Sequence, residues 1–399
     1  MENKGKRIAV IGAGPGGIAA GIALSQAGFD VKVFEKSSAI TPLGGAIILN
    51  ATGIVIMRKW GINVDEIFAA REPQFRRYDG HVRVKFELDK AILDKAGVTG
   101  WQSGMMRAEL YERMLKVVPE GVIVTSHALT KLEEQKDCIK LHFENGKTYE
   151  ADLVIGSDGI NSTVRKLLWG EDELKHLGIA VWLGWCELDG TSRTNIVIHH
   201  DRKYQFGYAP LIYRGKKCYE WWFVEKCTET QEKPADVMGY IKERVGHFAE
   251  PSAQILAHTD PSHQLFRWVV KYREPLQKWS KGRATIMGDA AHPTSPYAAY
   301  GAGMAIEDAF FLAKFLKGKD LSDVASLQEG LQKYEDERLA FTNKTTAFAR
   351  TLGKMYHGLP APLAYLRDLF LDNSSKPGKE IAKGYTEEAV SILKAILEE

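Results

Sequence analysis

Near its N-terminus the chain reads IAVIGAGPGG over residues 8–17. An apolar strand is predicted at its start, and glycines follow that strand in the spacing GxGxxG. Between a strand and a helix, here predicted over about residues 16–27, this spacing is typical of a dinucleotide-binding turn. Gly12 would permit the sharp turn, Gly14 would let a pyrophosphate approach the backbone, and Gly17 would let the helix pack closely on the strand.

A second strand is predicted over residues 31–35, and it ends in the acidic residue Glu35. A carboxylate at that place can accept hydrogen bonds from the hydroxyl groups of a ribose. The strand–helix–strand opening therefore predicts a site for NAD or FAD, which this motif alone does not tell apart. The alternative is a glycine-rich turn that only permits tight packing.

Two later segments each place an aspartate after a strand. The chain reads DLVIGSDGINSTVR over residues 152–165 and GRATIMGDAAHP over residues 282–293. In each, an apolar strand delivers Asp158 or Asp289 to its carboxyl end, where ligands bind in open α/β sheets. Alternatively, Asp158 is a turn residue and Asp289 caps a helix.

The middle of the chain is rich in predicted strands. A hairpin is predicted over residues 73–88, with Asp79-Gly80 as its turn, and another hairpin turn at Asn145-Gly146. The aromatic-rich segment 180–222 alternates apolar and polar residues, as antiparallel sheets do. Helices are predicted from residue 302 onward. The strand-rich middle therefore looks inserted into an α/β domain.

The composition is that of a globular protein. Of 399 residues, 45% are hydrophobic and 26% charged, and the formal net charge of +2 gives no electrostatic reason to bind nucleic acid. No apolar run reaches the roughly 18 residues of a membrane span. The four cysteines show no CxxC spacing, which argues against a zinc site or a disulfide framework and fits a reducing compartment. We expect a cytoplasmic monomer or homodimer without stable membrane association.

The three motifs, in this order and spacing, resemble those of the group A flavoprotein monooxygenases, single-component aromatic hydroxylases similar to para-hydroxybenzoate hydroxylase. The resemblance covers about residues 8–350. It is greatest to the short hydroxylases that act on salicylate, 6-hydroxynicotinate and urate, which share the segment MAIEDA, here at residues 304–309.

The resemblance implies an α/β fold with a Rossmann-like FAD-binding domain, an inserted, mostly antiparallel β-sheet domain for the substrate, and C-terminal helices. The FAD-binding domain would be discontinuous. The expected boundaries are 1–72, 101–178 and 271–352 for the FAD-binding domain, 73–100 and 179–270 for the substrate domain, and 353–399 for the C-terminal helical segment.

The resemblance also implies how FAD would be held. The glycines of the first turn would cradle the pyrophosphate, Glu35 would hold the adenosine ribose, and Asp289 would bind near the ribityl chain. Asp158 would also serve transient contact with NAD(P)H. The implied FAD-binding residues are Gly12, Gly14, Gly17, Glu35, Lys36, Gly45, Arg107, Asp158, Asp289, Gly301 and Ala302.

One stretch departs from the family pattern. Where relatives read GQGxN after the proline, this chain reads AYGAG over residues 299–303, so that Tyr300 replaces a glutamine and Gly303 an asparagine. Pro296 and Tyr300 are the candidates for contact with the flavin, and Tyr300 either adds a ring there or packs outward. No protein nucleophile or metal is expected.

The implied reaction is the hydroxylation of a small aromatic or N-heteroaromatic ring by an FAD-dependent monooxygenase. It consumes NAD(P)H and O2 and runs through a C4a-hydroperoxyflavin. One alternative is a relative that oxidises a larger polycyclic or isoprenoid substrate, such as a tetracycline-like compound. Another is a non-catalytic flavin-binding protein.

Candidate substrate residues come from the aromatic-rich segment. Strand alternation places Tyr204, Phe206 and Tyr208 on one face, which is either a wall of the substrate site or the core of the sheet. The full set of substrate candidates is Ile48, Trp185, Tyr204, Phe206, Tyr208 and Trp222.

Overall fold

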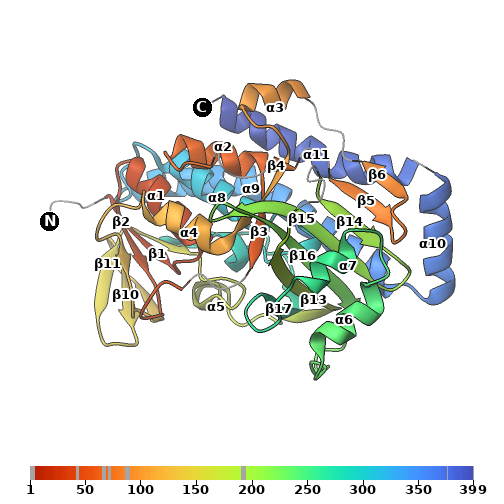
Figure 1. Cartoon of the computed structure of the whole chain (residues 1–399). Coiled ribbons are helices and arrows are strands. Elements are labelled where there is room, and N and C mark those ends of the chain that lie inside the picture. Colours follow the sequence, from red (N-terminus) through yellow and green to blue (C-terminus); the bar gives the residue numbers. More distant parts are fainter. Residues whose placement is uncertain are drawn as a thin grey trace.

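The fold is known from a computed structural model, which describes residues 5–41, 45–64, 69–70, 73–85, 90–189, 195–374 and 376–398 (Figure 1). It is the mixed α/β fold expected from the sequence, with a parallel sheet and a larger, mostly antiparallel sheet. Among the described residues, no helix is both long and apolar enough to cross a membrane.

A five-stranded parallel sheet holds the N-terminal motif, in the order β18-β12-β1-β2-β8. Its members are β1 (Arg7–Ile11), β2 (Asp30–Phe34), β8 (Ile123–Val124), β12 (Leu153–Gly156) and β18 (Ala284–Ile286). Helix α1 (Pro15–Gln26) joins β1 to β2, as the sequence predicts. Because parallel strands present their carboxyl ends at one edge, the three motifs meet there.

A seven-stranded sheet forms the second half of the molecule, in the order β17-β13-β16-β15-β14-β5-β6. Its pairs are antiparallel except β14 with β5, which run parallel. The predicted hairpin at Asp79-Gly80 is β5–β6, although residues 86–88 lie outside the described part. The strands are β5 (Gln74–Arg77), β6 (Val82–Lys85), β13 (Lys175–Glu187), β14 (Val197–His200), β15 (Gln205–Tyr213), β16 (Lys216–Lys226) and β17 (Leu265–Tyr272).

Two small sheets and a set of helices complete the fold. The sheets are β3 (Ala46–Asn50), β7 (Gln102–Met106) and β4 (Ala69–Ala70), and β9 (Leu129–Glu134), β10 (Ile139–Phe143) and β11 (Thr148–Ala151). The helices before residue 300 are α2 (Ala51–Lys59), α3 (Lys90–Ala96), α4 (Arg107–Leu115), α5 (Thr163–Trp169), α6 (Val237–Val245) and α7 (Ser252–Ala257). The later helices are α8 (Gly301–Leu316), α9 (Val324–Gly353), α10 (Ala361–Asn373) and α11 (Lys376–Leu397).

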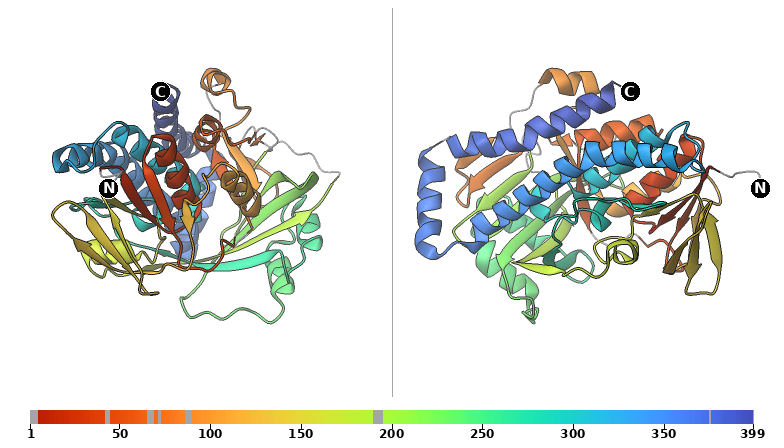
Figure 2. Two further views of the ribbon diagram at one scale, coloured as in Figure 1. Left: turned by 90° about the vertical axis from the view of Figure 1, so that its left-hand side faces the viewer. Right: turned by 180° about the vertical axis from the view of Figure 1, so that it is seen from behind.

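The two largest apolar cores lie on either side of the seven-stranded sheet. The larger core surrounds the parallel sheet, where α1 packs against α8 and α8 against the long helix α9 (Figure 2). The smaller core fills the space between the seven-stranded sheet and α6 and α7, and it includes Trp182, Phe206 and Trp221. The other face of that sheet is turned toward the cavity described next.

Candidate active site

One cavity of about 610 Å³ extends from the glycine-rich turn to the seven-stranded sheet. Its first end is lined by residues of the three sequence motifs, and its second end by apolar side chains of β13, β14 and β16. Of the residues proposed from the sequence, those that line it are Gly12, Gly14, Glu35, Lys36, Ile48, Arg107, Asp158, Trp222, Asp289, Pro296, Tyr300, Gly301 and Ala302.

The glycine-rich turn has the geometry that a pyrophosphate requires. Gly12 has a φ of +99°, and a Cβ there would lie 2.6 Å from the carbonyl oxygen of Ser157. A Cβ on Gly17 would lie 1.8 Å from the carbonyl oxygen of Gly12, so this glycine lets α1 approach the turn. Gly14, in contrast, faces open space, because its nearest neighbour would be the Tyr111 hydroxyl at 4.0 Å.

Glu35 holds the turn in place. Its Oε2 accepts a hydrogen bond of 2.9 Å from the backbone N–H of Ala13, and its Oε1 accepts one of 2.9 Å from the N–H of Ser37. Burial opposes ionisation, but these N–H donors and the neighbouring Lys36 outweigh it and lower the pKa of Glu35. The carboxylate is therefore ionised at neutral pH at the edge of the cavity.

Two charged groups at this end have polar atoms available for a ligand. The Nε of Arg107 is buried and has no hydrogen-bond partner among the described residues. Asp289, in the short helix η1 (Gly288–Ala290), lines the cavity, and burial raises the pKa of its carboxyl, although His292 and Arg107 oppose that rise. A buried guanidinium N–H without an acceptor is costly, so it fits a phosphate or carbonyl oxygen of a bound dinucleotide. With the open space at Gly14, these residues fit FAD.

Asp158 accepts hydrogen bonds from groups of the protein itself at the start of α5. Its Oδ2 accepts hydrogen bonds from the N–H groups of Thr163 and Val164, at 2.6 and 3.2 Å, and its Oδ1 accepts one from the Ser162 hydroxyl. The carboxylate thus caps the start of α5 while lining the cavity. These hydrogen bonds fix the loop between Asp158 and the start of α5 at the cavity wall.

Tyr300 packs inward and not outward. The residue is among those that line the cavity, it is 5% exposed, and its hydroxyl donates a hydrogen bond of 2.6 Å to Oε1 of Glu307. Its aromatic edge meets Phe341, with ring centroids 5.8 Å apart. The tyrosine therefore connects the start of α8, beside Gly301 and Ala302, to a buried ionic cluster deeper in the molecule.

Gly17 and Gly45 do not line the cavity themselves. Gly17 packs against the turn, as described, while the carbonyl oxygen of Gly45 accepts a hydrogen bond of 3.0 Å from the N–H of Arg107. The three residues after Gly45, over 46–48, form the cavity wall at that point.

Most of the aromatic substrate candidates lie away from the cavity. The rings of Tyr204, Phe206 and Tyr208 belong to the core beneath α6 and α7, on the opposite face of the sheet. Trp185 packs on the edge of Tyr213, with ring centroids 5.6 Å apart, and does not reach the cavity. Only Ile48 and Trp222 of this set line it.

The alternate residues of the same strands face the cavity instead. Gln205 and Glu220 both line it and are buried, and neither was singled out from the sequence. The Nε1 of Trp222 donates a hydrogen bond of 3.0 Å to Oε1 of Gln205, whose Nε2 lies 2.7 Å from Nε2 of His200. A signal was present, because Glu220 is two residues from Trp222 and so shares its face of the strand.

Comparison with known proteins gives a consistent result. Residues 6–349 match the family described as FAD binding domain. The chain is 31% identical over 350 residues to 6-hydroxynicotinate 3-monooxygenase of Bordetella bronchiseptica, covering 85% of this chain and 88% of that protein. It is 29% identical over 381 residues to 3-amino-4-hydroxybenzoate 2-monooxygenase PtmB3 of Streptomyces platensis, covering 92% and 93%.

Solved structures share the fold. The crystal structure of Klebsiella pneumoniae HpxO complexed with FAD and uric acid superimposes with a TM-score of 0.83 at 23% identity, covering 95% of this chain and 96% of that one. A salicylate hydroxylase substrate complex gives a TM-score of 0.72 at 21% identity, covering 96% and 98%.

Proposed function

Since the chain belongs to the FAD binding domain family, which it matches over residues 6–349, and is an FAD-dependent monooxygenase like its relatives, we propose that it hydroxylates a small aromatic or N-heteroaromatic ring, using NAD(P)H and O2. The observation that supports this most directly is the single cavity, which joins a dinucleotide-type turn to an apolar, aromatic-walled pocket. Relatives of similar length are monooxygenases of 6-hydroxynicotinate and of 3-amino-4-hydroxybenzoate.

At the first end of the cavity, the chain offers groups suited to each part of FAD. The N-terminus of α1, at Gly14, would face the pyrophosphate, because helix N-termini stabilise negative charge. Arg107 would donate from its free Nε, and Asp289 would accept from hydroxyl groups of the ribityl chain. Lys36 lies beside Glu35 at the adenosine end. When bound, FAD supplies the exchange of electrons with NAD(P)H and the activation of O2.

The start of α8 would meet the flavin ring. Gly301 and Ala302 line the cavity at the first turn of this helix, whose N-terminal N–H groups carry partial positive charge. Such donors stabilise negative charge that develops on a bound ring. Pro296 and Tyr300 would lie next to this contact.

At the second end, the walls would exclude water from the reacting ring. Val181, Leu183, Ile196 and Trp222 line the cavity there. Apolar walls suit a planar ring and protect reactive oxygen species from water. Gln205 and Glu220 are polar side chains on this wall. They would therefore orient the substrate.

The proposal predicts flavin reduction that depends on the substrate. Purified holoprotein would be mixed anaerobically with NADH or NADPH, with and without small phenols, hydroxypyridines and purines, and flavin absorbance would be followed. We expect one ring class to accelerate reduction at least tenfold over the ligand-free rate. Fast reduction without any ligand would contradict substrate-gated hydroxylation, and a protein that no reductant bleaches would favour the non-catalytic alternative.

The larger-substrate alternative is tested by the same measurement. Tetracycline destructases share the fold, with TM-scores of 0.66 and 0.67. If a tetracycline accelerates flavin reduction while the single-ring compounds do not, the polycyclic alternative replaces the proposal. The cytoplasmic location stays a prediction.

A further inference from the structure

Glu220 is a buried carboxyl group whose Oε1 has no partner among the residues that the structure describes. It is 4% exposed, and it lines the cavity. A buried polar group that makes no hydrogen bond costs free energy, on the order of 1–3 kcal/mol. Retaining such a group in a ligand cavity is explained if the ligand supplies the missing partner.

The surrounding backbone makes room for this carboxyl. On β16, Glu220 shares its face with Trp222 and Val224, which also line the cavity. A Cβ on Gly104 of β7 would lie 2.9 Å from Oε1 of Glu220, so a side chain at residue 104 would push against the carboxyl. Burial raises the pKa of Glu220 to about 8, so at neutral pH it is mainly a neutral acid that can both donate and accept.

Cationic side chains lie elsewhere in the cavity. Among the described residues that line it, they are Lys36 and Arg107, both at the end that holds the glycine-rich turn. A carboxylate substituent placed near Glu220 would therefore lose its hydration without gaining a described cation. A hydroxyl, amino or ring N–H group would instead pair directly with the carboxyl.

We propose that Glu220 is the substrate-recognising residue of this cavity, and that it binds the hydroxyl, amino or ring N–H group of a one-ring aromatic substrate without a carboxylate. This inference rests on the proposed function. It differs from the substrates named for the relatives, since hydroxynicotinate and aminohydroxybenzoate are carboxylates.

Two matched ligand pairs test this inference by calorimetry on the FAD-loaded protein. They are 2-hydroxypyridine against 6-hydroxynicotinate, and 2-aminophenol against 3-amino-4-hydroxybenzoate, and each pair differs only by a carboxylate. We expect the ring without the carboxylate to bind at least tenfold more tightly. Glu220→Leu should weaken that binding about tenfold or more, because the hydrogen bond is lost, whereas Glu220→Gln should stay within about threefold of the wild type.

A surface variant serves as the control. Glu187 pairs with Lys216 at the protein surface. The variant Glu187→Gln should bind all four ligands with the affinity of the wild type. Tighter binding of the acids, wild-type affinity in Glu220→Leu, or no binding of either pair overturns the inference. Failure of the proposed function itself shows differently, as a holoprotein whose flavin NAD(P)H does not reduce with any ligand.

A second, independent observation concerns helix α10, whose large apolar side chains are exposed while its charged side chains Arg367 and Asp368 are buried. Five large apolar side chains face outward and are between 49% and 59% exposed: Leu363, Tyr365, Leu366, Leu369 and Phe370. We call these residues the α10 patch. The helix stands at the edge of the molecule (Figure 1; Figure 2, right).

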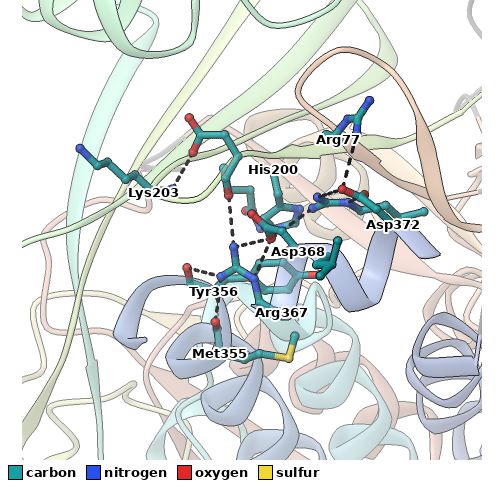
Figure 3. A network of polar contacts seen from close by, with 12 residues as sticks. Arg77, His200, Lys203, Met355, Tyr356, Arg367, Asp368 and Asp372 are labelled. Carbon is teal, nitrogen blue, oxygen red and sulfur yellow. Dashed lines mark hydrogen bonds and ion pairs between the residues drawn. The ribbon is translucent and has the colours of Figure 1, made fainter. Parts of the chain in front are cut away.

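The charged residues of α10 face inward and fix the helix. Arg367 donates to Oδ1 of Asp368 and to the carbonyl oxygens of Met355 and Tyr356, the last two at 2.9 and 3.0 Å (Figure 3). Asp372 accepts a hydrogen bond of 2.6 Å from Nε of Arg83 on β6. The apolar face is thus presented by a helix anchored to the rest of the chain.

We propose that the α10 patch is the interface of a homodimer. A two-fold axis needs a surface that complements itself, and five apolar side chains do so without charge pairing, while Arg202 stacks over the Tyr365 ring at 4.9 Å at the margin of the patch. Five half-exposed large side chains offer roughly 500 Å² on each chain, so about 1,000 Å² in total, which reaches the lower limit for a specific interface. A patch of roughly 500 Å² is as large as the largest apolar patch on a typical monomeric protein, and such patches are often functional.

The homodimer is tested by size-exclusion chromatography with light scattering on the FAD-loaded full chain. We expect two chains per particle, and one chain per particle in the double variant Leu366→Glu/Phe370→Glu with an unchanged melting midpoint. Val324, which is 51% exposed on α9, gives the matched control Val324→Glu, which should remain dimeric. A monomeric wild type, a dimeric double variant, or a wild type that sediments with phosphatidylcholine–phosphatidylglycerol vesicles overturns the proposal.

Discussion

A Gly14→Val protein is expected to fold normally and to lack yellow colour. Gly14 has a φ of −68°, which valine adopts without strain, and a Cβ there meets nothing closer than the Tyr111 hydroxyl at 4.0 Å. The valine methyl groups would instead fill the open space where the pyrophosphate approaches the start of α1. We expect the Kd for FAD to rise at least about 100-fold, which corresponds to about 2.7 kcal/mol.

The measurement is the titration of apoprotein with FAD, followed by flavin fluorescence. Gly53→Ala is a suitable control, because Gly53 lies in α2 outside the cavity lining and its Cβ would meet only Leu49, at 4.0 Å. That variant should bind FAD as the wild type does. A normally yellow Gly14→Val protein would refute the assignment of this turn to FAD.

Replacing Arg338 with leucine is expected to destabilise the whole protein strongly. The Nε of Arg338 donates to Oδ1 of Asp308 and its Nη2 to Oε2 of Glu307, both at 2.8 Å, and all three side chains are 0% exposed. Removing the guanidinium leaves two buried carboxyl groups without their cation, which costs on the order of 3–5 kcal/mol.

The same cluster supports the cavity. Oδ2 of Asp308 accepts hydrogen bonds from the N–H of Gly288 and from His292, at 2.9 and 2.6 Å, and Glu307 accepts from Tyr300. Arg338→Leu should therefore lower the thermal midpoint by roughly 4–6 °C and loosen the FAD end of the cavity as well.

Another arginine of α9 provides the control. Arg350 pairs with Glu274 at 3.3 Å, and the Glu274 side chain is 56% exposed. Arg350→Leu should cost about 1 kcal/mol or less, because a solvated ion pair contributes little. Thermal scans by circular dichroism at one FAD concentration compare the two variants. Equal midpoints would show that the buried cluster does not hold α8 and α9 together.

Local sequence patterns predicted the elements that depend on neighbouring residues. Helix α1 appears within one residue of the expected bounds, and β1 and the glycine-rich turn precede it as expected, because strand, turn and helix start are all encoded within residues 7–26. The hairpin turns at Asp79-Gly80 and Asn145-Gly146 were found for the same reason. The domain boundaries and the FAD contacts stay predictions, supported by which residues line the cavity.

The sequence did not show which face of the long sheet would meet the cavity. Alternation correctly grouped Tyr204, Phe206 and Tyr208, but both faces of this sheet are covered, one by α6 and α7 and the other by the cavity. When both faces are buried, aromatic content no longer marks the functional one. The three rings are buried between the sheet and helices α6 and α7. Gln205 and Glu220 lie on the opposite face and line the cavity.

The sequence by itself thus determined the dinucleotide turn, its acidic partner Glu35 and the order of the motifs, because each is set by residues close together in the chain. Only the tertiary structure decided that Oε1 of Glu220 has no partner in the described part of the chain and that α10 turns its apolar residues outward. The orientation of α10 arises from contacts between segments far apart in sequence, such as Arg83 with Asp372. Strand alternation places Glu220 on the same face as Trp222, but whether its carboxyl finds a partner depends on which distant segments pack around it.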